Sequence, residues 1–159
     1  DKSSNPIVYQ LQDGNPAYSE INLVPAFKDN LYFVYTGKKK RSKEAVKAFL
    51  NHSDIDKKAI NELSVINQQI IKAKNLDTFE YAVKKHEKLV AGVLKKTDVL
   101  KDQYPGIPGE MKSLGAWGGD FALLTWRDSR EDLKETLRKY HLFTFFNWNE
   151  IVLNHEKHA

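Results

Sequence analysis

Short apolar runs separated by turn residues begin the chain, and this pattern is typical of β-strands. Residues 7–11 (IVYQL) are rich in β-branched and aromatic side chains, and the turn-forming residues 13–16 follow them. Apolar and polar positions then alternate over residues 18–24, so the two segments predict a hairpin. Leu31–Tyr35 (LYFVY) is almost wholly apolar, which indicates a central strand covered on both faces.

Apolar residues recur at helical spacing in the middle of the chain. The spacing predicts three helices, at residues 42–50, at about 56–74 and at about 77–94, with Ser42 as the cap of the first. Only a short connection around Asn75 separates the last two, so we expect them to form an antiparallel pair. The buried stripe of the third helix comprises Phe79, Ala82, Val83, His86, Leu89, Val90, Val93 and Leu94.

The C-terminal part returns to strands. Residues 112–125 (KSLGAWGGDFALLT) are typical of a strand, a glycine turn and a second strand. Ser129 can cap a helix, the run 142–146 (LFTFF) predicts a last strand, and a short helix can follow from Asn147. The order is about three strands, three helices, two strands, a helix and a strand. This predicts an α+β fold with helices packed on one face of a mainly antiparallel sheet.

The glycine turn is the first candidate for chemistry. Three glycines in five residues permit positive φ angles and close approach of the backbone, and exposed N–H groups in such a turn can bind an anion. A tight hairpin that binds nothing explains the same glycines. The spacing fits neither a dinucleotide-binding nor a Walker phosphate loop. The residues of the turn are Gly115, Ala116, Trp117, Gly118, Gly119 and Asp120.

Composition narrows the classes of protein. With 159 residues, 41% of them hydrophobic, the chain is expected to form one domain with a real core. There is no cysteine, no run of membrane-spanning length and no signal peptide, which favours a cytoplasmic location without membrane contact. The net charge of +4 is mild, and the basic cluster at 38–41 explains much of it. Because the chain begins at Asp1 without methionine, we expect a fragment.

Other candidate chemistry is sparse. The five histidines form no metal-ligand pattern, so no metal site is expected, and no serine stands in a nucleophile elbow. His86 lies on the apolar side of its helix, where it is either a core histidine or a functional one. Thr36 and Gly37 end a buried strand shortly before Ser42, so this strand end can bind an anion or merely lead into a helix cap.

Taken together, these segments resemble the C-terminal domain of the GHMP kinase superfamily. The resemblance rests on LYFVYTG followed by KKKRSKEAV, on KKHEKL, and on KSLGAWGGDFALL, and it extends over residues 7–151. The nearest branch is the mevalonate kinase-like GYDIA family of bacteria. The resemblance implies a ferredoxin-like sheet and an ATP-dependent kinase that phosphorylates a hydroxyl or phosphate of a small molecule.

The resemblance also implies site residues. The third motif of the family, Lys-x-Thr-Gly-Ala-Gly-x-Gly-Gly, is matched by Lys112, Gly115, Ala116, Gly118 and Gly119. Leu114 stands where threonine is common, and Trp117 directly precedes the paired glycines, so the turn is one residue shorter. By the same resemblance, His86, Arg41 and Ser42 are expected on the substrate side.

The resemblance finally implies that an N-terminal kinase domain is the missing partner. The main phosphate loop, most contacts to ATP and Mg²⁺, and the catalytic residues are expected upstream of Asp1, so this chain alone should be inactive. Two other readings stay open: a degenerate kinase subunit, and a non-catalytic module that binds a metabolite, a protein or RNA. Tyr32, Phe33 and Tyr35 could stack on RNA bases, but no RNA-binding motif is present, and no nucleic acid is expected. Oligomeric state is open.

Overall fold

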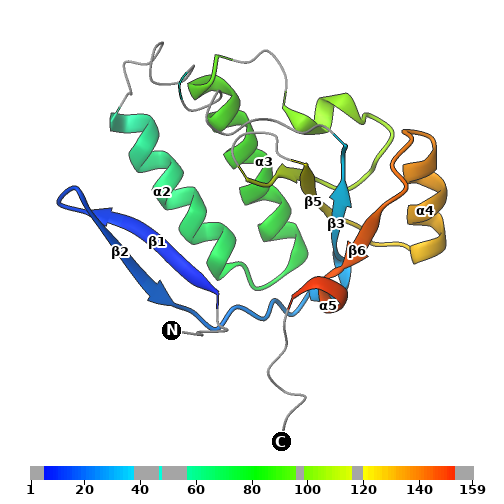
Figure 1. Cartoon of the computed structure of the whole chain (residues 1–159), viewed down its shortest axis with the longest axis horizontal. Coiled ribbons are helices and arrows are strands. Elements are labelled where there is room, and N and C mark those ends of the chain that lie inside the picture. Colours follow the sequence, from blue (N-terminus) through cyan, green and yellow to red (C-terminus); the bar gives the residue numbers. More distant parts are fainter. Residues whose placement is uncertain (1–5, 38–46, 48–56, 96–98, 116–119, 153–159) are drawn as a thin grey trace, which may run out of the picture.

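A four-stranded antiparallel sheet forms the centre of this computed structural model, which describes residues 6–37, 47, 57–95, 99–115 and 120–152 (Figure 1). The strands lie in the order β4-β5-β3-β6. Their bounds are β3 (Leu31–Tyr35), β4 (Met111–Ser113), β5 (Phe121–Thr125) and β6 (Phe145–Asn147). The helices are α2 (Lys57–Lys72), α3 (Leu76–Val93), α4 (Arg130–Arg138) and α5 (Trp148–Ile151), with 3-10 turns η1 (Lys28–Asn30) and η2 (Leu100–Gln103).

The element order confirms the predicted fold class. From β3 onward the chain runs strand, helices, strand, strand, helix, strand, which is the ferredoxin-like order. The apolar run Leu31–Tyr35 is the central strand, as predicted, with β5 and β6 as its antiparallel neighbours. The expected helix at 42–50 lies outside the described residues, apart from residue 47.

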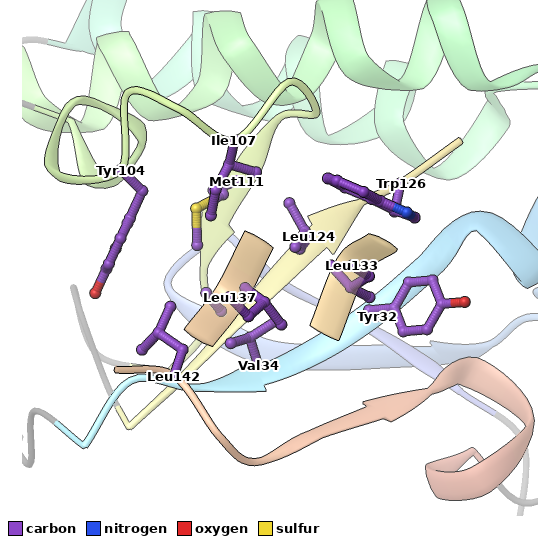
Figure 2. Packing of buried hydrophobic residues seen from close by; sticks show 11 residues of the cluster. Tyr32, Val34, Tyr104, Ile107, Met111, Leu124, Trp126, Leu133, Leu137 and Leu142 are labelled. Carbon is purple, nitrogen blue, oxygen red and sulfur yellow. The ribbon is translucent and has the colours of Figure 1, made fainter. Parts of the chain in front are cut away.

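Helices cover both faces of this sheet. The pair α2 and α3 lies on one face, where Leu31 packs with Phe79 and Val83 of α3. We expected all helices on one face, and α4 departs from this expectation. Leu133 and Leu137 of α4 pack against the other face, as Figure 2 shows. Successive residues of a strand point to opposite faces, so a wholly apolar β3 can contribute to the core on each face. The buried residues that form the core on the α4 side include Tyr32, Val34, Ala122, Leu124, Met111, Ile107 and Trp126.

The α4 helix ends in a Schellman motif that shifts the last strand. His141 has φ 58°, in the left-handed region, and the Leu142 N–H donates to the Leu137 carbonyl at 3.1 Å. This turn buries Leu142 against the α4 side of the sheet, so the strand expected at 142–146 begins only at Phe145. The expected cap Ser129 is confirmed, since its side chain accepts from the Asp132 N–H.

A separate two-stranded sheet precedes β3. It comprises β1 (Ile7–Gln12) and β2 (Asn15–Glu20), joined by Asp13 and Gly14 with φ of 51° and 80°. Two left-handed residues are what a tight two-residue hairpin turn requires. The second strand therefore begins at Asn15, directly across from Gln12, and not at residue 18 as predicted.

The Asn75 cap gives a first test of local stability. Its side chain accepts a hydrogen bond from the Thr78 N–H at 2.9 Å at the start of α3. We expect Asn75→Ala to lower the free energy of unfolding by about 1 kcal/mol, because one N-terminal amide loses its partner. Asn61→Ala, at an exposed position inside α2, is the matched control and should be neutral or slightly stabilising, because alanine is the better helix former. Equal effects of the two variants in urea unfolding would contradict the capping role.

No helix in the described part of the chain is both long enough and apolar enough to span a bilayer.

Candidate functional site

A buried carboxylate, Glu87 of α3, is the centre of the candidate site. Only 6% of this residue is exposed. Its Oε2 atom accepts two hydrogen bonds from Ser113, one from the backbone N–H at 3.2 Å and one from the hydroxyl at 3.0 Å. Ser113 is the last residue of β4, so these bonds tie α3 to the point where the strand enters the glycine turn.

Two further groups contact the other oxygen of the same carboxylate. His86 Nδ1 lies 3.3 Å from Glu87 Oε1, and Lys112 Nζ lies 3.7 Å from it. Lys112 pairs with Leu123 of β5 and therefore shares the sheet face that α3 covers. We call His86, Glu87, Lys112 and Ser113 the Glu87 cluster.

Burial and charge act in opposite directions on the pKa values of the cluster. Burial by itself would raise the pKa of Glu87, but the His86 hydrogen bond, the charge of Lys112 and the two Ser113 bonds together lower it below its ordinary value. Burial also lowers the pKa of Lys112, and the Glu87 carboxylate offsets only part of that effect. Glu87 is therefore held as a carboxylate.

Both ends of the glycine turn are fixed to the sheet. On the β4 side, the Leu114 N–H donates to the Phe121 carbonyl at 3.1 Å, and Gly115 has φ 72°. On the β5 side, the Asp120 carbonyl accepts from the Thr36 N–H at 2.7 Å and from the Thr36 hydroxyl at 3.2 Å. The end of β3 thus meets the glycine turn, so the two anion-binding candidates of the sequence lie at the same end of the sheet.

The structure brings several predicted site residues together. Lys112 and His86 join in the Glu87 cluster, and Gly115 and Asp120 flank the turn. The remaining predicted site residues lie outside the described part of the chain; they are Arg41, Ser42, Ala116, Trp117, Gly118 and Gly119.

Sequence reasoning missed Glu87, the most buried charged residue of the site. Glutamate is common on exposed helix faces, so its residue type alone did not mark it. The signal was present, because Glu87 follows Val83 by four positions and Phe79 by eight, and all three are buried on one face of α3. A carboxylate at a core position of a helix requires a partner, and Lys112 is that partner.

The described residues of this site can hold the glycine turn in position. Among the described residues, no three His, Asp or Glu side chains gather closely enough to hold a metal ion. Of the three aromatic residues considered for RNA stacking, Tyr32 is 7% exposed and Phe33 packs in the core beside α3. Tyr35 is 39% exposed and packs on the Phe121 ring, so no exposed row of aromatic side chains is formed by these three residues. The Glu87 cluster instead provides structural support for the glycine turn at one end of the sheet.

Comparison with known proteins supports the fold assignment. No family model and no curated protein matches the chain. The solved structures that share its fold include L. major mevalonate kinase in complex with R-mevalonate, with a TM-score of 0.63, 16% identity and 89% of this chain covered. Methanococcus jannaschii mevalonate kinase matches 87% of the chain at 21% identity and a TM-score of 0.61. Streptococcus pneumoniae phosphomevalonate kinase matches 86% at 17% identity and a TM-score of 0.60.

The fold of this chain is therefore that of the matched part of these mevalonate and phosphomevalonate kinases. The match covers 47%, 45% and 45% of these three structures respectively, so the chain spans less than half of their length.

Proposed function

We propose that this chain is the C-terminal, substrate-side half of an ATP-dependent small-molecule kinase of the GYDIA branch. The observation that carries the proposal is the convergence at one end of the sheet of the glycine turn, the strand end at Thr36 and the Glu87 cluster. The fold shared with mevalonate and phosphomevalonate kinases supports it. The acceptor is then a hydroxyl or phosphate of a mevalonate-like or sugar-like metabolite.

The complete protein would use ATP and Mg²⁺, which together supply the phosphoryl group and neutralise its charge. The described residues do not fit a magnesium site, because no acidic cluster is present among them and the charge of Lys112 already faces Glu87. We assign most contacts to ATP and Mg²⁺ to an N-terminal domain outside this sequence. The 159-residue chain alone should accordingly be inactive.

The contribution of this half is the position of the turn. Glu87 accepts both Ser113 bonds and so fixes where β4 ends, while the Thr36 hydroxyl and N–H hold the Asp120 side. Phosphoryl transfer depends mainly on positioning and charge, so a small displacement of a wall of the site has a large effect on rate.

ADP formation by the complete protein tests this proposal. Mevalonate, phosphomevalonate and galactose serve as acceptors, and the 159-residue chain is assayed in parallel. We expect turnover by the complete protein with at least one acceptor and none by the chain alone. We expect Lys112→Met to lower kcat/KM about 100-fold, because the glycine turn then loses part of the Glu87 cluster that holds it in position.

Lys88→Met, at an exposed position of the same helix as Glu87, is the control and should change kcat/KM less than about twofold. Both variants are assayed well below their melting temperatures, so that loss of folded protein does not contribute. Nucleotide binding without turnover would indicate a degenerate kinase subunit, and turnover by the isolated chain would contradict the two-half arrangement.

A further inference from the structure

The β1–β2 hairpin has one apolar face that nothing in the described chain covers. Strand alternation and the register place six residues on this face: Glu20 at its end, opposite Ile7, and five apolar residues, which we call the apolar hairpin face: Ile7, Tyr9, Leu11, Pro16 and Tyr18. Tyr9 and Tyr18 lie directly opposite each other and are 62% and 74% exposed. Ile7 and Leu11 are 57% and 66% exposed. Isolated exposed apolar residues are ordinary, but a contiguous face of this size marks an interaction surface.

The opposite face of the hairpin has a different character. It carries Gln10, Gln12, Asn15 and Ser19, with Val8 and Ala17 between them. The hairpin is therefore amphipathic, with apolar side chains on one face and mainly polar side chains on the other. An antiparallel sheet with one polar face normally packs its apolar face on a core.

The rest of the described chain does not supply that core. Among the described elements, β1 and β2 make extensive contact only with each other, and Figure 1 shows the blue hairpin standing apart from the four-stranded sheet. A lone two-stranded hairpin is marginally stable in water. Its apolar face must be covered for the hairpin to contribute to a stable protein.

We propose that the apolar hairpin face docks against the other half of the complete kinase. This inference rests on the proposed function. In each of the similar solved structures more than half of the chain lies outside the part that this chain matches, so a partner of comparable size is available in the complete kinase we propose. Of the 11 large apolar side chains that are exposed in the described residues, four lie on this face. Tyrosine at the centre of the patch is typical of protein interfaces.

Hydrogen exchange of the amides of residues 7–20 tests the inference, measured by mass spectrometry in the complete protein and in the 159-residue chain. We expect exchange at least about tenfold slower in the complete protein, because docking suppresses opening of the hairpin. The double variant Tyr9→Ser/Tyr18→Ser in the complete protein should bring exchange back to within about twofold of the isolated chain. Gln10→Ser/Ala17→Ser replaces the neighbouring cross-strand pair on the polar face and should leave protection unchanged.

Equal exchange in the two proteins would overturn the inference. Protection that grows with protein concentration would also overturn it, because a second copy of the chain would then be the partner. The kinase assay is independent of this result. Slower amide exchange in a complete protein that shows no turnover supports the interface and contradicts the kinase proposal. Turnover without slower exchange supports the kinase proposal and contradicts the interface.

Discussion

Gly109→Ala is expected to lower the free energy of unfolding by about 3 kcal/mol or more, and the melting temperature by roughly 6–12 °C. A Cβ atom at this position would lie 1.7 Å from the Thr125 carbonyl oxygen and 2.9 Å from the Thr125 hydroxyl. Neither Thr125 oxygen can move away from the added Cβ atom. Thr125 is 1% exposed at the end of β5, and its hydroxyl accepts from the Glu110 N–H and donates to Glu80. Relief of the clash must therefore separate the 104–110 loop from the sheet.

Gly92→Ala is the matched control for this prediction. A Cβ at Gly92 meets nothing within 4 Å, and the residue lies in α3, where alanine is the better helix former. Thermal unfolding of the two variants should therefore shift in opposite directions. A melting temperature for Gly109→Ala within about 2 °C of the parent chain would show that the loop adjusts freely and would contradict the packing described here.

Removal of the Glu87 carboxylate should have the second large effect. Glu87→Leu leaves Lys112 largely buried without its countercharge and leaves the Ser113 N–H without its acceptor, so we expect a loss of about 3 kcal/mol. Adding Lys112→Met should recover much of that loss, because two apolar side chains can replace a buried ion pair. Urea unfolding of the single and double variants measures the coupling. Strict additivity would show that the two side chains do not interact.

The pH dependence of stability gives an independent check on the same carboxylate. The folded-state pKa of Glu87 is lowered, so its stabilising contribution is fully present above the unfolded value of about 4.3 and is lost as pH falls through the folded pKa. The stability difference between the parent chain and Glu87→Gln should thus be constant above about pH 5 and shrink below about pH 4. Glu62→Gln on the exposed side of α2 should show little difference at any pH. A Glu87→Gln difference that persists undiminished at pH 2 would contradict the ionised state.

Local sequence patterns predicted the elements of this fold better than their arrangement. The run Leu31–Tyr35 identified the central strand, because only a strand buried on both faces is apolar throughout. The helix after Ser129 was predicted as well, but a predicted helix does not indicate which face of the sheet it will cover. Leu133 and Leu137 pack on the side away from α3, and that choice is made by the tertiary structure.

The candidate site was predictable where a residue type carried its own signal. His86 was named because a histidine on the apolar face of a helix is unusual in itself, and Lys112 because it matches the first residue of the third GHMP motif. Glu87 was missed because glutamate is common on exposed helix faces, and its burial depends on a strand about 25 residues further along the chain. The pairing that defines the site is a long-range contact, and local sequence patterns do not report such contacts.

The central pair of the sheet also has a consequence for the order of folding. Leu31 pairs with Thr125 and Tyr35 with Phe121, so 94 and 86 residues separate partners that lie side by side. The α2–α3 pair, by contrast, is closed by a connection of only a few residues. Closing a long loop costs chain entropy before any contact across it is gained. The helical pair can therefore form early, while β3 stays without its β5 partner until most of the chain is available.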